Sequence, residues 1–228
     1  MQNFADKYLG DTMKRRSKKV ILTAAAIGLL GIALWSYNNK RDLVMAEEAD
    51  KVVLTVDDVD LTLGDIAFYV AYQELKVEKQ ARIYDYYDPK AYWNLHTDGE
   101  FVKVAAKRAV IEMAVHDEIF CRMAEEEGVE LTAEEEELLI SRQQDFWSDL
   151  TEEQQEKLGV TQEEINLQIR KAALAEKYQN IIAKRNHSDY NAYGIGELPY
   201  EIMLKEHDYR VHNNVWNRIR FGDVILTH

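Results

Sequence analysis

The sequence has few residues that cross-link or interrupt a chain. It contains a single cysteine, Cys121, and two prolines among 228 residues. One cysteine excludes an intramolecular disulfide, so the fold must depend on its hydrophobic core. With only ten glycines and 46% hydrophobic residues, the composition is that of a folded domain and not of a disordered chain.

The sequence also lacks the spacings of common catalytic sites. Its six histidines are scattered, and it has no His-Glu-x-x-His motif, no paired cysteines and no glycine-rich phosphate loop. Glu112 and His116, four residues apart, are best explained as an ion pair on one helix face. Cys121 lies in an apolar stretch and is best explained as a small core residue. We therefore expect no enzyme activity, no catalytic residue, no metal and no cofactor.

Charge is distributed unevenly along the chain. The formal net charge is −13, but residues 1–45 carry +5, so residues 46–228 carry −18. A strongly acidic surface repels phosphate backbones, which argues against nucleic acid as a partner.

The basic N-terminal segment leads into eighteen uncharged residues, Val20–Tyr37. This length is just sufficient for a helix that spans a bilayer, and the excess of basic residues before it predicts a cytoplasmic N-terminus. The alternative is a cleaved signal peptide, with Val44 and Ala46 as the small residues before cleavage. We expect a retained single-pass anchor in the cell membrane. The expected parts are a cytoplasmic segment 1–19, a transmembrane helix 20–37 in contact with lipid, a linker 38–50 and an extracytoplasmic domain 51–228.

Helix starts in the exported part share one local signal. An apolar residue precedes a threonine, and an acidic or amide side chain follows three residues later, so that the two side chains can exchange hydrogen bonds with each other's backbone. The pairs are Thr62 with Asp65, Thr132 with Glu135, Thr151 with Gln154, and Thr161 with Glu164. With hydrophobic periodicity, they predict a mainly α fold with helices near 64–85, 100–127, 133–148, 152–158, 162–185 and 199–217.

Residues 125–137 contain eight glutamates in thirteen positions. The run could be a disordered acidic tail, a cation-binding cluster or a corner between two helices. Gly128 can take the left-handed conformation after a last helical turn, and Thr132 can begin the next helix. The glutamates after Thr132 then lie at the positive end of the helix dipole. The sequence therefore predicts a helix corner.

Strands are expected at both ends of the exported part. Residues 52–59 are rich in β-branched residues and contain an Asp-Asp turn, which indicates a short strand or hairpin. Residues 219–226 alternate apolar and basic residues and then become apolar. We expect this terminal segment to pair with Val52–Val56, because a lone strand leaves backbone groups without partners.

Aromatic residues gather on the helix predicted near 64–85 and in the loop between it and the next predicted helix. Such residues can fill a core, or they can line a groove that holds an extended apolar peptide without strict sequence demands. The candidates for peptide binding are Tyr69, Tyr72, Tyr84, Tyr86, Tyr87, Tyr92 and Trp93.

The order of these elements resembles the helical chaperone module of the SurA and PrsA foldases. The resemblance covers roughly residues 51–185. It is carried by the strand, turn and capped helix of "VVLTVDDVDLTLGDIAFYV", by the long helix, glycine corner and threonine cap of "AYWNLHTDGEFVKVAAKRAVIEMAVHDEIFCRMAEEEGVELTAEEEELL", and by the closing helix of "LGVTQEEINLQIRKAALAEKYQNII". In that family the module holds unfolded exported chains, and a parvulin prolyl-isomerase domain commonly follows the closing helix. About 44 residues follow Lys184 here, fewer than a parvulin domain needs.

The resemblance thus implies a membrane-anchored extracytoplasmic chaperone that binds unfolded or exported polypeptides without isomerase catalysis. The alternative is a non-catalytic protein that binds one fixed partner in a secretion or envelope assembly. The breadth of the polypeptides bound would distinguish the two.

Overall fold

The structure, a computed structural model, describes residues 42–227. The predicted cytoplasmic segment 1–19, the predicted transmembrane helix 20–37 and the first residues of the predicted linker lie outside this range. Among the described residues, the helices are too short or too polar to cross a bilayer.

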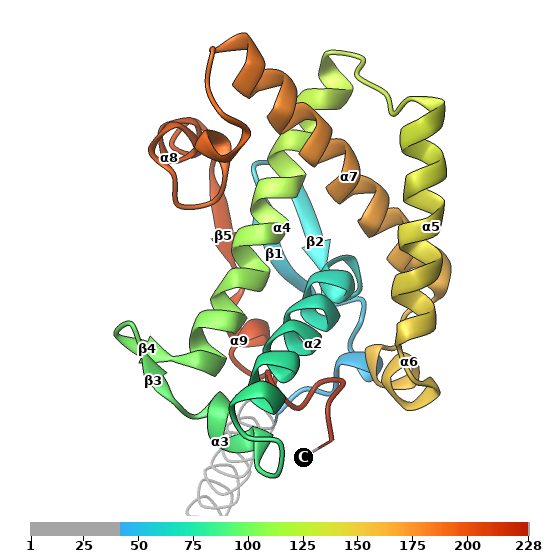
Figure 1. The fold of residues 1–228 in the computed structure, drawn as a ribbon, viewed down its shortest axis with the longest axis vertical. Helices are drawn as coiled ribbons and strands as arrows, with labels where there is room; N and C mark the ends of the chain where they lie inside the picture. Colours follow the sequence, from blue (N-terminus) through green and yellow to red (C-terminus); the bar gives the residue numbers. More distant parts are fainter. Residues whose placement is uncertain (1–41, 228) are drawn as a thin grey trace, which may run out of the picture. The chain divides into compact units, whose positions relative to one another are not determined.

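Residues 42–227 are mainly helical, with a small antiparallel sheet (Figure 1). The longer helices are α2 (Ala67–Tyr84), α4 (Val102–Glu126), α5 (Ala133–Asp149) and α7 (Gln162–Arg185). The shorter helices are α3 (Pro89–Trp93), α6 (Glu152–Leu158), α8 (Leu198–Leu204) and α9 (Asn213–Trp216), with 3₁₀ turns η1 (Met45–Glu47), η2 (Gly64–Ile66) and η3 (Tyr190–Tyr193). The strands are β1 (Val52–Val56), β2 (Val59–Thr62) and β5 (Tyr209–Val211) in one sheet, and β3 (His96–Thr97) and β4 (Glu100–Phe101) in a separate hairpin.

The threonine signals begin helices as predicted. Thr132, Thr151 and Thr161 each accept a hydrogen bond from the backbone three residues later, and each threonine amide donates to the side chain at that position. Thr62 and Asp65 exchange the same pair of bonds at 2.8 and 3.1 Å before η2. Satisfied first-turn amides fix where a helix begins, which is why the predicted starts at 152 and 162 agree with α6 and α7, and left-handed Gly159 ends α6 at Leu158.

The acidic run is a helix corner, as predicted. α4 ends at Glu126, and Gly128 takes a left-handed φ of 68°. The Gly128 amide donates to the Glu125 carbonyl and the Val129 amide to the Ala124 carbonyl, the two bonds of a Schellman motif. The chain then turns into α5 at Thr132.

The partner of β1 differs from the prediction. The hairpin of β1 and β2 is confirmed, but the other edge of β1 pairs antiparallel with β5, with Leu54 opposite Val211 and Val56 opposite Tyr209. The helix predicted over 199–217 is therefore wrong, since it is divided into α8, β5 and α9. The backbone groups on the second edge of β1 need hydrogen-bond partners, and the extended strand β5 supplies them. This requirement outweighs the helical hydrophobic pattern of residues 200–216.

The predicted pairing of residues 219–226 with Val52–Val56 is wrong, and the terminal segment is held in two other ways. Leu43 forms an isolated parallel bridge with Ile219, and its amide donates to the Arg218 carbonyl at 2.8 Å. The fully buried carboxylate of Glu74 on α2 accepts bonds from the amides of Gly222, Val224 and Ile225 at 2.6, 3.1 and 2.9 Å. The buried carboxylate of Glu74 thus accepts the hydrogen bonds that a neighbouring strand would otherwise accept from these amides.

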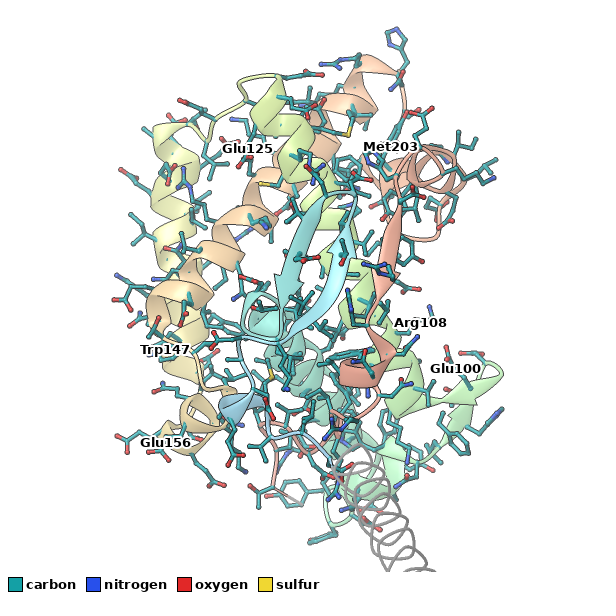
Figure 2. The ribbon with its side chains drawn as sticks, turned by 180° about the vertical axis from the view of Figure 1, so that it is seen from behind. Glu100, Arg108, Glu125, Trp147, Glu156 and Met203 are labelled. Atoms are coloured by element: carbon teal, nitrogen blue, oxygen red, sulfur yellow. The ribbon has the colours of Figure 1, made fainter. Side chains whose placement is uncertain are left out.

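The sheet and helices form layers around a shared core. α4 lies over one face of the sheet and packs against α2 and α7 (Figure 1), and the view from behind shows the sheet in front of α4 (Figure 2). Buried residues from each layer meet in this core, among them Val53, Leu54, Val70, Val110, Ile119 and Ile225. On the opposite face Thr55 bonds to Asp60 at 2.7 Å and His212 at 2.9 Å, so polar groups cover the outer side.

Two short elements between α2 and α4 were not predicted. α3 follows Asp88, whose carboxylate accepts a bond from the Ala91 amide, with Pro89 in the first turn. β3 and β4 form a hairpin around Asp98 and Gly99, which have φ angles of 52° and 93°. An Asp-Gly pair is a strong signal for a two-residue hairpin turn. This signal could have been recognised in the sequence.

Candidate polypeptide-binding surface

The seven aromatic candidates do not form one surface. Tyr69 and Trp93 are core residues, with 2% and 3% of their surface exposed. Tyr72 is partly exposed on α2 but lies twelve residues before the end of that helix, about 18 Å along its axis. Its ring contacts Phe68, which contacts Phe146 on α5. The remaining four, Tyr84, Tyr86, Tyr87 and Tyr92, gather where α2 passes into α3.

Trp93 anchors the C-terminal segment. Its ring meets Phe221 edge-on with centroids 6.1 Å apart, and its indole N–H points to Glu78 at 3.4 Å. A Cβ on Gly222 would lie 3.1 Å from the Trp93 ring, and Gly222 has a φ of +96°. The backbone conformation favours glycine there, and a side chain would also crowd the Trp93 ring. The alternative explanation, that aromatics in this loop fill the core, is therefore correct for Trp93.

Tyr69 belongs to a buried polar chain. Its hydroxyl donates to Asp117 at 3.0 Å, and the other oxygen of Asp117 lies 2.8 Å from His116 Nδ1. Burial, and then the charge of Asp117, raise the pKa of Tyr69 well above its ordinary value. The predicted Glu112–His116 ion pair is wrong. Glu112 binds Arg108 at 2.6 Å, while the His116 ring turns inward onto Phe120.

The end of α2, the loop after it and α3 carry the apolar side chains that we call the aromatic tip: Ile83, Tyr84, Tyr86, Tyr87 and the partly buried Tyr92. Tyr84 is 60% exposed and Tyr87 94% exposed, and Ile83 and Tyr86 are exposed as well. Asp85 holds the loop, because its carboxylate accepts bonds from the amides of Tyr87 and Asp88 at 2.9 and 3.1 Å. Ring contacts of 5.5 Å join Tyr84 to Tyr92 and Tyr86 to Tyr87. Tyr92 packs partly against the core, and the exposed rings of Tyr84, Tyr86 and Tyr87 are displayed beyond it.

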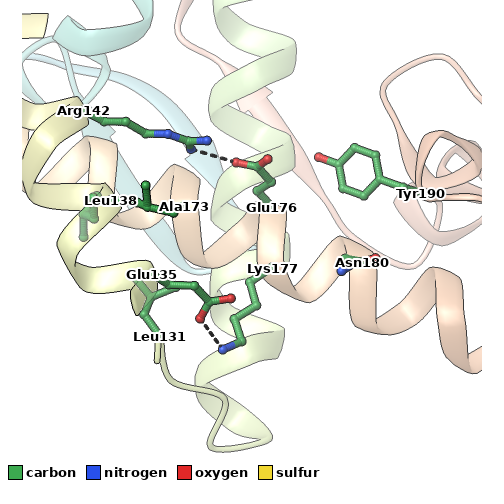
Figure 3. A pocket seen from close by; sticks show the side chains of 10 residues that line it. Leu131, Glu135, Leu138, Arg142, Ala173, Glu176, Lys177, Asn180 and Tyr190 are labelled. Atoms are coloured by element: carbon green, nitrogen blue, oxygen red, sulfur yellow. Dashed lines mark hydrogen bonds and ion pairs between the residues drawn. The ribbon is translucent and has the colours of Figure 1, made fainter. Parts of the chain in front are cut away.

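A second surface, which the sequence reasoning missed, is the groove between α5 and α7 (Figure 3). It encloses about 390 Å³ and has apolar walls from Leu131, Leu138, Leu139, Ala173 and Tyr190. Ion pairs cross it, Glu135 with Lys177 at 2.6 Å and Arg142 with Glu176 at 3.1 Å. The adjacent leucines Leu138 and Leu139 were the feature of the sequence that could have indicated this groove. Successive helical residues diverge, so Leu139 is buried and Leu138 remains 64% exposed.

The lone thiol, Cys121, is buried, and burial followed by the charge of Glu125 raises its pKa to about 12. A thiol with such a pKa remains protonated and is a weak nucleophile at neutral pH. Within residues 42–227, no three histidine, cysteine or acidic side chains are placed to hold a metal ion.

The chain was compared with protein-family models, curated proteins and solved structures, and none of these comparisons gave a match. The resemblance to the SurA and PrsA modules therefore stays a prediction from the sequence.

Proposed function

We propose that the domain binds non-native or newly exported polypeptides at the outer face of the cell membrane, as a chaperone of the SurA and PrsA type without isomerase catalysis. The predicted helix at 20–37 anchors it. The aromatic tip is the observation that carries this proposal. Its rings are ordered by Asp85 yet exposed to solvent.

Exposed rings suit the binding of varied unfolded chains. A contiguous exposed apolar patch on a soluble domain is typical of an interaction site. Tyrosine offers a flat apolar face together with a hydroxyl, and it loses little side-chain entropy when it is covered. The acidic remainder of the domain keeps it soluble while the tip is free.

The test is the triple substitution Tyr84→Ser, Tyr86→Ser and Tyr87→Ser, which leaves the buried Tyr69 and Trp93 intact. We expect the apparent affinity for a chemically unfolded client to fall on the order of a hundredfold, since three aromatic contacts are worth a few kcal/mol. Light scattering of the aggregating client and far-ultraviolet circular dichroism of the variant would measure binding and fold together.

The matched control is Leu198→Ser with Ile202→Ser, which removes exposed apolar side chains from α8. It should leave suppression of aggregation unchanged. Equal losses in both variants, or no suppression by the wild-type protein with any client, would remove the chaperone proposal. Turnover of a prolyl-isomerase peptide above background would show a catalytic site that the proposal does not contain.

The α5–α7 groove favours the second candidate function, which is the binding of one fixed partner. Its apolar walls lie between two ion pairs, Glu135–Lys177 and Arg142–Glu176. Charged groups in fixed positions favour a partner with one particular sequence, bound in one particular position along the groove. Leu138→Glu should abolish capture of such a partner while client aggregation is still suppressed. Loss of aggregation suppression in Leu138→Glu would instead assign the groove to general chaperone binding.

A further inference from the structure

A second cavity, which we call the basic groove, lies between α3, the first turns of α4 and the C-terminal segment. It encloses about 680 Å³, with Trp93, Trp216 and Phe221 among its apolar walls. Its cationic lining comprises Lys90, Lys103, Lys107, Arg108 and Arg220. This collection of positive charge is unusual in a chain whose residues 46–228 carry −18.

The two arginines of the basic groove are already neutralised. Arg108 binds Glu112 at 2.6 Å and Glu100 at 2.5 Å, and Figure 2 shows Arg108 with Glu100 nearby. Arg220 is paired with Asp42. Asp223, the other acidic residue of the lining, is exposed.

The three lysines have no carboxylate partner among residues 42–227. Lys103 donates to the neutral oxygen of Asn94 at 2.9 Å. Lys107 donates to the Ile219 carbonyl at 2.7 Å and lies over the Trp216 ring, 4.9 Å from its centroid. Burial lowers the pKa of Lys107 to about 8, although Asp42 opposes the shift. An incoming anion would supply the missing counter-charge to Lys90 and Lys103 and would add to that of Asp42 at Lys107.

The place where the chain enters the domain limits what such an anion can be. Asp42 lines the basic groove and is the first described residue. Residues 38–41 separate it from Tyr37, the end of the predicted transmembrane helix, and this stretch can reach at most about 18 Å when fully extended. If residues 20–37 span the bilayer, the basic groove is therefore tethered within reach of the headgroups.

We propose that the basic groove docks on anionic phospholipid headgroups of the membrane that holds the anchor, with Lys90, Lys103 and Lys107 contacting their phosphates. This inference rests on the predicted anchor and is independent of client binding by the aromatic tip. Lysines near an anionic surface contribute about equally and are screened by salt, so the docked state weakens as ionic strength rises.

The experiment uses the full chain in nanodiscs of phosphatidylcholine alone or mixed with phosphatidylglycerol. Amide hydrogen exchange is followed in residues 89–108 and 216–223. We expect slower exchange in both segments with phosphatidylglycerol. Lys90→Gln with Lys103→Gln should reduce the ratio of docked to free domain about thirtyfold, which is about 2 kcal/mol at 1.4 kcal/mol per decade. Lys107 is kept because its bond to Ile219 is structural.

The matched control is Lys184→Gln with Lys205→Gln, two exposed lysines outside the basic groove, which should leave the protection unchanged. Equal exchange in both lipid mixtures would overturn the proposal. Protection by inorganic phosphate alone in phosphatidylcholine discs would also overturn it, since the site would then bind a free anion. Suppression of client aggregation is measured on the same variants. If only this activity fails, the chaperone proposal is lost and the docking proposal stands.

Discussion

Helices α5, α6 and α7 begin at residues that carry their own local signals, whereas residues 198–227 are held by distant segments. Thr132, Thr151 and Thr161 satisfy the first turns of three helices from within a few residues. The C-terminal part instead depends on Glu74, on β1 and on the ring of Trp93, all more than a hundred residues away in the sequence. Local bonds fix element boundaries, while remote bonds fix which segment pairs with which.

The largest effect should come from deletion of residues 219–228. Ile219, Phe221, Ile225 and Leu226 are buried, and each such side chain contributes about 1.5–3 kcal/mol on burial. The deletion also leaves Glu74 without its three amide donors. We expect a loss of roughly 6 kcal/mol or more, measured by urea denaturation, or complete unfolding. An unchanged midpoint would show that the C-terminal segment does not support the core.

The next largest effect is a pH dependence of the free energy of unfolding, which arises from Glu74 where it binds the C-terminal segment. Burial raises the pKa of Glu74 from 4.5 to about 7, although the amides of Ile225, Gly222 and Val224 oppose the rise. A raised folded-state pKa contributes stability that is fully present below the unfolded value and is lost as pH rises through about 7. At about 1.4 kcal/mol per unit, this is about 3 kcal/mol.

Unfolding free energies at about pH 5 and about pH 8 would measure this contribution. Glu74→Gln imitates the protonated carboxyl and should remove it, so the variant should lose less stability on going to the higher pH than the wild type. Parallel curves for the two proteins would show that Glu74 does not titrate in this range.

A smaller effect is expected where β5 is attached to the hairpin. The carboxylate of Asp57, in the turn between β1 and β2, accepts from the Asp208 amide at 2.9 Å and lies 2.9 Å from His207 Nδ1. Asp57→Asn keeps a residue that tolerates its φ of 51° but removes the charge, so we expect a loss of about 1.5 kcal/mol, as for a hydrogen bond to a charged group. The neighbouring Asp58→Asn is the control, because its ion pair with Arg122 at 2.9 Å is exposed to solvent and its loss should be nearly neutral in thermal denaturation.

The smallest effect should be that of a local signal. Thr161→Ala removes the oxygen that accepts from the Glu164 amide at 3.2 Å, and should cost about 1 kcal/mol. α7 should still form, because its buried face packs against α4. Thr97→Ala, at an exposed residue that caps no helix, is the comparison for denaturation and hydrogen exchange. A loss far above that of Asp57→Asn would reverse the contrast between the two regions.

Part of the candidate site could be predicted from the sequence, because local signals place the aromatic segment between two helices. The sequence identified the segment that carries Tyr84, Tyr86 and Tyr87, at the end of α2 and in the loop after it, since a segment between two helix signals lies at the surface. It could not separate them from Trp93, which the loop carries into contact with Phe221. The α5–α7 groove also required two helices to be placed side by side, and Leu138 becomes a wall only in that arrangement.

The sequence by itself determined the helical class, the threonine caps, the corner at Gly128 and the bounds of α6 and α7, because each depends on hydrogen bonds between residues a few positions apart. The tertiary structure alone decided that β5 pairs with β1, that Glu74 binds the C-terminal amides and that three lysines share one groove. Those contacts join residues far apart in the chain. Their free energy depends on burial and charge around both partners, which no local stretch of sequence contains.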